Sequence, residues 1–124
     1  MRLKSGIWVK AYLRRCEVAG AFAAVRRHGD DDAGAIFIKI ARAGGQAALY
    51  GPAPAGLGDR DEGDVRGMGR TFIAAATGQF LADAEIEKKL EREAGFDSDL
   101  WIVEVEDRDG RHFLGDELIG TCAS

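Results

Sequence analysis

The sequence holds little of what disulfide-rich and metal-binding domains need, with two cysteines and two histidines among 124 residues. Cys16 and Cys122 lie far apart and match no zinc or redox spacing, so we expect free thiols and no disulfide. The cysteines, histidines and acidic residues also fit no metal motif. We therefore expect neither a metal site nor a cofactor.

Long apolar runs are absent as well. The two longest candidates, residues 7–13 and 35–41, are each interrupted by a lysine, and neither approaches the roughly 20 apolar residues of a membrane-spanning helix. The apolar stretch behind the basic first residues carries Lys10, Arg14 and Arg15, and no small-residue cleavage site follows it. We expect a cytoplasmic protein with no membrane partner.

No motif identifies a reaction. The glycine pairs at 56–58 and 67–69 fit neither phosphate-binding fingerprint, and residues 30–32 lack the alternating ligands of a calcium loop. The serines occupy no strained strand-to-helix turn, which leaves Cys16 as the one candidate nucleophile. The alternative for Cys16 is an ordinary buried cysteine.

Length and composition predict one domain over residues 1–124, because 46% hydrophobic residues in a chain of this size can build one core. The net charge of -4 divides unevenly: residues 1–42 carry nine basic and four acidic residues (+5), and residues 43–124 carry eight and seventeen (-9). Such an asymmetry can drive partner binding, or the two parts can neutralise each other in the fold.

The N-terminal residues predict a strand followed by a helix. Residues 6–14 alternate between apolar and polar side chains, the period of a half-buried strand. Residues 16–28 change to helical spacing, and Gly29 stands where a left-handed cap belongs.

A hairpin follows. Residues 35–42 and 46–50 have strand composition, and Gly44-Gly45 between them suits a two-residue turn with positive φ. That turn sets a register with Ile40 opposite Leu49 and Lys39 opposite Tyr50.

Residues 51–69 hold both prolines and show no periodicity, which indicates either a functional loop or a mobile one. Residues 70–77 have weak strand character. Asp83 is expected to cap a helix that runs to Ala94 and ends at Gly95, with Phe96 folding back onto Leu90.

Residues 100–106 form the clearest strand, and Asp109-Gly110 predicts a second hairpin into residues 111–114. The last ten residues give no clear signal. The predicted order is β-α-β-β-(loop)-β-α-β-β, an α+β fold with an antiparallel or mixed sheet and two helices packed on it. A three-layer arrangement with a parallel crossover is the alternative.

Several segments together resemble a family of small bacterial cytoplasmic proteins of unknown function. They are Trp8–Arg15, Ala33–Lys39, Leu49–Pro54, Phe96–Arg108 and Gly110–Leu114. The resemblance covers nearly the whole chain outside the loop at 51–69. It implies a bacterial cytoplasmic protein, with no assigned activity and no catalytic residues.

The first candidate site is a charged cluster in the predicted C-terminal hairpin. A two-residue turn there would place Asp107 opposite His112, where the carboxylate could orient the imidazole as a general base or metal ligand. The cluster also contains Glu104, Glu106, Arg108 and Arg111. The alternative is a solvent-exposed hairpin whose charges only keep the edge soluble.

The second candidate is one face of the first predicted strand, where aromatic and basic residues interleave: Trp8, Lys10, Tyr12 and Arg14. Such a face can stack on and neutralise single-stranded nucleic acid. A pI near 5.2 argues against nucleic acid as the main partner. The alternative is aromatic packing beneath a helix.

The sequence leaves the molecular function unknown and favours a non-catalytic interaction or regulatory domain, whose partner is another protein or a second copy in a homodimer. A small metal-assisted or hydrolase-like enzyme is the second hypothesis, and a nucleic-acid module the third.

Overall fold

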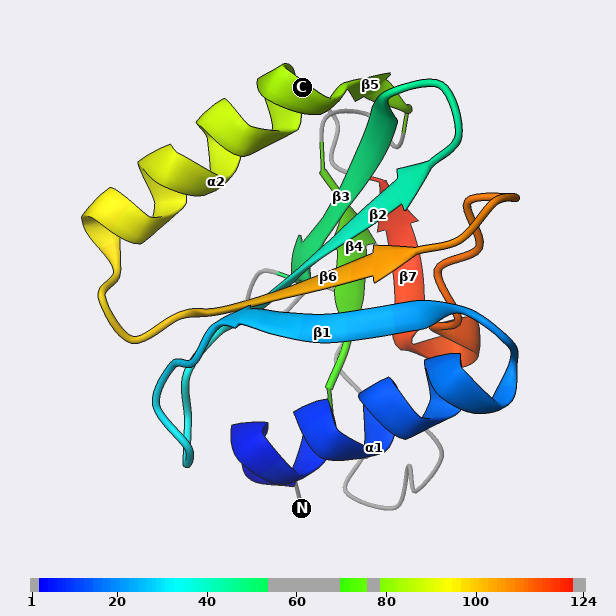
Figure 1. The fold of residues 1–124 in the computed structure, drawn as a ribbon. Coiled ribbons are helices and arrows are strands. Elements are labelled where there is room, and N and C mark those ends of the chain that lie inside the picture. Colours follow the sequence, from blue (N-terminus) through cyan, green and yellow to red (C-terminus); the bar gives the residue numbers. More distant parts are fainter. Residues whose placement is uncertain (1–2, 54–69, 76–78, 122–124) are drawn as a thin grey trace.

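The computed structural model describes residues 3–53, 70–75 and 79–121 (Figure 1). The helices are α1 (Ser5–Val18), α2 (Asp83–Phe96) and a short 3-10 turn at Gly115–Glu117. The strands are β1 (Phe22–Arg27), β2 (Ile36–Arg42), β3 (Gln46–Pro52), β4 (Phe72–Ala74), β5 (Leu81–Ala82), β6 (Trp101–Glu106) and β7 (Leu118–Thr121). Within the described residues, no helix is long and apolar enough to cross a membrane.

The strands form one mixed sheet in the order β1-β6-β2-β3-β4-β7, with β5 paired to β3. The β6–β2 and β4–β7 pairs are parallel, and the β1–β6, β2–β3 and β3–β4 pairs are antiparallel. The predicted α+β class, with a mixed sheet and two helices packed on it, is confirmed. The helices cover opposite faces, so the chain forms three layers, α1, sheet and α2, with β6 parallel to β2, which is the arrangement given as the alternative (Figure 1).

The first two elements were predicted in exchanged positions, and the rest of the order broadly holds. Residues 5–18 form helix α1, with Ser5, Trp8, Val9, Tyr12 and Cys16 buried at intervals of three and four residues. The alternation over residues 6–14 arises only because basic residues lie between the buried residues of this helical face. Tertiary burial of the two aromatic side chains decides for the helix.

Residues 22–27 form strand β1 instead of the predicted helix. Gly20 ends α1 with φ of 90°, a conformation that favours glycine, and the chain reverses into the sheet. Gly29 is not a helix cap: a side chain there would overlap the carbonyl oxygen of Asp99 at the entry to β6. Gly29 thus permits a close approach between two loops.

The hairpin between β2 and β3 is confirmed, but its register differs by one residue from the prediction. Ile40 pairs with Ala48 and Lys39 with Leu49, because the loop has three residues, Ala43, Gly44 and Gly45. Both glycines have positive φ, as the predicted turn required.

The second predicted hairpin is wrong. Strand β6 is confirmed, but both of its edges are already paired, with β1 on one side and β2 on the other. No edge remains for residues 111–114, which leave the sheet without forming a strand. Phe113, with φ of 59°, belongs to this irregular segment.

Helix α2 begins at Asp83 with Ala82 as its N-cap, and no side chain caps it. It continues through Gly95, and Phe96 at its end is 84% exposed instead of packed on Leu90. The predicted strand at 70–77 appears as β4, and residues 51–53 of the predicted loop extend β3 and the segment after it. Residues 54–69 and 76–77, Cys122 and the end of the tail lie outside the described residues.

Two hydrophobic clusters hold the layers together. Trp8, Val9 and Tyr12 of α1 pack against side chains of β2 and β6, and Trp8 also contacts Phe72 at 5.0 Å between ring centroids. On the other face Ile86 and Leu90 of α2 pack against β3 and β6. Burial of these apolar side chains is the main favourable contribution to the folding free energy.

A buried carboxylate fixes α1 to the C-terminal segment. Glu117, which is 2% exposed, accepts hydrogen bonds from Trp8 Nε1 at 3.0 Å and from Arg15 at 2.6 Å. Arg15 also donates to the carbonyl of Phe113, and Tyr12 Oη donates to that of His112. These bonds fix the position of α1 relative to the sheet.

A second charged network joins α2 to the sheet. Lys39, whose side chain is 4% exposed, pairs with Asp83 at 2.6 Å and with Glu87 at 2.5 Å. Arg26 of β1 pairs with Glu87 and Glu104. The hydrogen bond from Arg26 is the largest cause of the lowered pKa of Glu87, about 2 against an ordinary 4.5.

This shift predicts a measurable acid dependence of stability. A carboxylate whose pKa is lower in the folded than in the unfolded protein stabilises the fold above the unfolded value, and that stabilisation is lost as the pH falls toward about 2. We expect Glu87→Gln to flatten the pH dependence of the unfolding free energy across this window, measured by urea denaturation. Glu91→Gln, an exposed acid one turn later, is the control. Equal slopes for Glu87→Gln and wild type would contradict this expectation.

Candidate functional site

The structure separates the members of the predicted C-terminal cluster. Asp107 does not face His112: its carboxylate accepts hydrogen bonds from the backbone N–H of Arg111 at 2.8 Å and from the Arg111 guanidinium at 2.7 and 3.1 Å. The hydrogen bonds from Arg111 hold the pKa of Asp107 below its ordinary value. Asp107 is 6% exposed, so it anchors the turn that follows β6.

His112 lies in a separate environment. Its Nδ1 accepts a hydrogen bond from the backbone N–H of Leu114 at 3.0 Å, and its ring lies 5.3 Å from that of Tyr50. Burial lowers the pKa of His112, so the imidazole is neutral near pH 7. Its Nδ1 is already occupied and no carboxylate in the described residues contacts the ring, so the Asp107–His112 pair expected of a general base is not formed here.

The remaining members of the cluster face elsewhere. Glu104 points to the α2 side of the sheet, where it meets Arg26 and Lys39, while Glu106 and Arg108 are exposed. Arg111 contacts Asp107 and lies over the Phe113 ring. Asp107 and Arg111 form one pair, and Glu106, Asp107 and Arg108 line a hollow of about 390 Å³, while Glu104 and His112 lie elsewhere.

The predicted aromatic and basic face is also divided, because these residues lie on a helix. Trp8 and Tyr12 are buried and stack on each other with centroids 5.0 Å apart. Lys10 and Arg14 are exposed on the other side of α1. Neither aromatic ring is available to stack on a nucleic-acid base.

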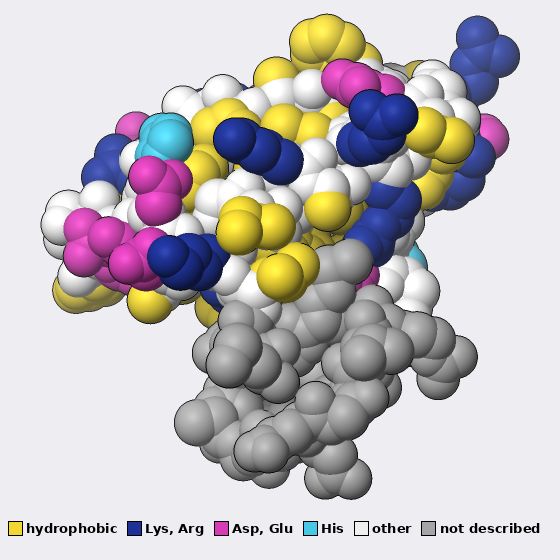
Figure 2. Space-filling view, turned by 90° about the horizontal axis from the view of Figure 1, so that it is seen from below, with side chains coloured by type: hydrophobic (Ala, Val, Ile, Leu, Met, Phe, Trp, Pro, Cys, Tyr) yellow, Lys and Arg dark blue, Asp and Glu magenta, His cyan; other side chains and the backbone are white. Residues whose placement is uncertain are grey.

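A wide hollow on the described surface lies between α1 and β1. This groove, called the α1–β1 groove below, has a volume of about 600 Å³, a size typical of ligand sites. Its lining residues include Ile7, Lys10, Leu13, Val25, His28 and Trp101. Figure 2 shows this side of the molecule, with hydrophobic side chains among lysines and arginines and a histidine beside acidic residues at one end.

The loop at one end of the groove is held by backbone contacts. The N–H groups of Ser5 and Gly6, at the start of α1, donate to the carbonyl oxygens of Asp32 and Asp31. These bonds satisfy donors that a helix N-terminus leaves without partners. Ser5 Oγ donates to the carbonyl of Gly34 at 2.7 Å, which ties the loop to the helix a second time.

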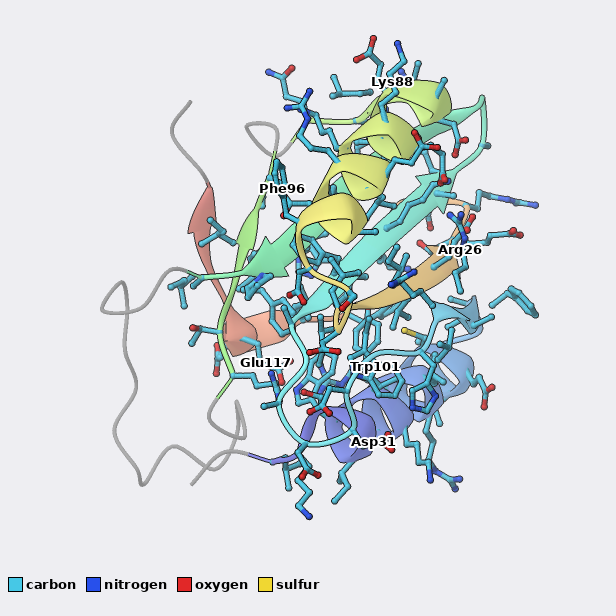
Figure 3. All side chains as sticks on the ribbon, turned by 90° about the vertical axis from the view of Figure 1, so that its left-hand side faces the viewer. Arg26, Asp31, Lys88, Phe96, Trp101 and Glu117 are labelled. Atoms are coloured by element: carbon cyan, nitrogen blue, oxygen red, sulfur yellow. The ribbon has the colours of Figure 1, made fainter. Side chains whose placement is uncertain are left out.

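Asp30 organises the loop from within. Its carboxylate accepts hydrogen bonds from the N–H groups of Asp32 and Ala33, and its carbonyl accepts one from Trp101 Nε1 at 2.8 Å. The loop is therefore fixed to α1 and to β6 together. Figure 3 shows Asp31 and Trp101 on the α1 side of the sheet, with Arg26 nearer to α2.

This loop presents a histidine and a carboxylate to the groove. The His28 ring stacks on Trp101 with centroids 4.1 Å apart, and its Nε2 lies 2.9 Å from Asp31 Oδ1. Both side chains are well exposed, at 65% and 71%. Among the described residues no three metal-ligating side chains converge, here or elsewhere. The pair can bind a polar group at the end of the groove.

Strand β1 forms an open edge beside the groove. It pairs with β6 on one side, and no strand in the described ranges pairs with its other side. Five large hydrophobic side chains are exposed among the described residues, and four of them belong to α1 or β1: Ile7, Val18, Phe22 and Val25. An edge with exposed apolar residues is a template for pairing with another chain.

A second, smaller groove of about 260 Å³ lies on the other face of the sheet, between β1 and α2. Arg26, Arg27, Glu87 and Glu91 contribute to it. The open edge of β1 thus has a mainly apolar groove on its α1 side and a charged groove on its α2 side.

The sequence reasoning missed this region because it exchanged α1 and β1. The helical spacing of Ser5, Trp8, Tyr12 and Cys16 was the available signal, and it would have placed Ile7 and Lys10 outside the buried face. Nothing local predicts that His28 stacks on Trp101, since 73 positions separate them in the sequence. That contact depends on the β1–β6 pairing.

Asp107 gives a prediction that separates a structural from a functional role. Asp107→Ala removes a buried acceptor of three hydrogen bonds, so we expect it to destabilise the protein by about 1–3 kcal/mol in urea denaturation. Arg108→Ala, at an exposed neighbour, should change stability little. An unaltered unfolding midpoint in Asp107→Ala would contradict the anchoring role.

Solved structures similar to this chain come from two bacteria. A crystal structure of a DUF1491 family protein from Caulobacter crescentus CB15 shares 37% identity with a TM-score of 0.74, over 96% of this chain and 99% of that one. The solution structure of protein Atu0922 from A. tumefaciens shares 40% identity with a TM-score of 0.76, over the full length of both chains.

No functionally curated protein matches this chain. The family described as "Protein of unknown function (DUF1491)" matches residues 3–115. This match covers most of the chain and agrees with the two solved structures, as the resemblance in the sequence led us to expect. The chain therefore belongs to the DUF1491 family of proteins of unknown function.

Proposed function

We propose that this protein is a non-catalytic interaction domain that binds an extended segment of another protein along the open edge of β1. The observation that carries the proposal is that this open edge lies between two grooves, one on each face of the sheet. A bound segment would add a strand to the sheet.

Strand addition uses both features of the site. Backbone hydrogen bonds to the edge provide affinity, and alternate side chains enter pockets on the two faces and provide specificity. Val25 pairs with Val103, which belongs to the α1-side core, so Val25 faces the α1–β1 groove. Phe22 pairs with Glu106 on the other face and is 64% exposed.

The far half of β1 limits where a partner strand can pair. The ladder with β6 has a bulge between Val25 and Arg27, and two arginines follow Val25. Bulges and charged residues are common means of blocking edge pairing. The first half, Phe22–Val25, is apolar and regular, so the partner strand pairs there.

A second copy of this chain is a weaker occupant on electrostatic grounds. The surface around the edge carries Lys10, Arg14 and Arg27, and none of these forms an ion pair with a carboxylate in the described residues. Two copies joined edge to edge would bring these cations together, which costs binding energy. A different partner with fewer basic residues avoids that cost.

Peptide selection tests the proposal directly. We expect a displayed library of random linear peptides to yield binders whose affinity falls about tenfold or more in Ile7→Glu, because Ile7 lines the groove and is 51% exposed. Phe96→Glu introduces the same charge at an exposed apolar residue at the end of α2 (Figure 3) and should leave the affinity unchanged.

Peptide N-methylation then tests the mode of binding. A strand pairs through every second N–H, so methylation at alternate positions should abolish binding in one phase and be tolerated in the other. Equal tolerance of both phases, binders insensitive to Ile7→Glu, or no binders at all would contradict strand addition at this edge. Sedimentation of the protein alone reports self-association, and a dimer lost in Ile7→Glu would assign the edge to a second copy instead.

A further inference from the structure

The α1–β1 groove has a charge pattern that its apolar walls alone would not require. Ile7, Leu13 and Val25 supply apolar surface along its length. Lys10 lies on the same flank of α1 as Ile7 and Leu13, three residues from each, which are neighbouring positions on a helix surface. A cation therefore stands midway along an apolar wall.

The carboxylates that line the groove lie at its loop end. Asp31 lies against His28 at 2.9 Å, and Lys4 lies 3.6 Å from Asp32. Lys10 forms no ion pair with any carboxylate in the described ranges, and neither does Arg14, one helical turn later. The carboxylates of the groove thus lie at the loop end, while Lys10, away from the loop, has no acidic partner among the described residues.

The groove on the α2 side differs, because it contains acidic residues and its cations already have ion-pair or hydrogen-bond partners. Arg26 pairs with Glu87 and Glu104, and Arg27 donates to the carbonyl of Ser98 at 3.1 Å. Glu91 adds a further negative charge. Side chains of a bound strand that point to this face gain little from being acidic.

We propose that the segment held on β1 has apolar side chains at alternate positions, which enter the α1–β1 groove, and an acidic side chain at one end that pairs with Lys10. This inference rests on the proposed function and specifies its partner. The remaining side chains, which face α2, are small and uncharged. An acidic and apolar segment also fits the cationic surface around the edge better than a second copy does.

Defined peptides test this partner chemistry. The probes are fluorescein-labelled hexapeptides with valine at odd and threonine at even positions, kept soluble by a terminal polyethylene glycol chain, with Glu, Gln or Lys at either the first or the fifth position, the two ends of the valine face. We expect the Glu peptide of one orientation to bind about threefold to fivefold more tightly than its Gln counterpart at low ionic strength, the effect of an exposed ion pair. The difference should shrink at about 0.5 M salt.

Charge reversal assigns the effect to one residue. In Lys10→Glu the preference should invert, so that the Lys peptide binds more tightly than the Glu peptide. Lys88→Glu, which makes the same change at an exposed lysine of α2, should keep the wild-type order. Both substitutions are at exposed positions and preserve the fold.

The outcomes separate this inference from the one it rests on. Peptides that bind and lose affinity in Ile7→Glu, but bind equally with Glu, Gln or Lys, would overturn the acidic preference and leave strand addition standing. A preference that persists in Lys10→Glu would also overturn it. If neither these hexapeptides nor any library peptide binds, strand addition itself fails.

Discussion

The burial of one face of α1 against the sheet is the constraint on which the rest of this structure depends. Trp8, Val9, Tyr12 and Cys16 are each at most 1% exposed, and Glu117 and Arg15 hold the helix in place through charged hydrogen bonds. With that face fixed, the flank that carries Ile7, Lys10 and Leu13 must lie beside β1. The groove therefore follows from how the helix packs.

The same packing explains why β1 can remain an open edge. The loop after β1 binds the start of α1 through Ser5 and Gly6, and Trp101 of β6 fixes the loop through Asp30. These contacts fix the C-terminal end of β1 without a strand on its outer side. Because β1 is already fixed, it loses little conformational entropy when a partner binds, and this favours affinity.

The sequence predicted those features that depend on short-range signals. Gly44 and Gly45 marked the first hairpin, alternation marked β6, and the pattern around Ile86 and Leu90 marked α2. The register of the hairpin was missed because a three-residue loop uses the same two glycines as a two-residue one. Asp109-Gly110 does form a turn, with Gly110 at φ of 74°, but the strand expected after it has no free edge to join.

The prediction for the start of the chain was wrong because both a strand period and a helix period fit its residues. Residues 6–14 satisfy alternation and helical spacing at once, and only burial of Trp8 and Tyr12 on one side distinguishes them. This one ambiguity concealed the groove, since Lys10 and Arg14 seemed to share a face with those aromatic rings. The charge asymmetry of the sequence was informative: part of the excess positive charge of residues 1–42 lies on α1 and β1, around the open edge.

Amide hydrogen exchange of β1 tests the central claim most directly. With a selected peptide bound, the account predicts slower exchange for outward-facing amides within Phe22–Val25, while amides already bonded to β6 change little. Slowed exchange on α1 with β1 unchanged would show that the groove binds without strand addition. Slowed exchange only at a distant surface such as α2 would show that the peptide binds elsewhere. Either result would contradict the account.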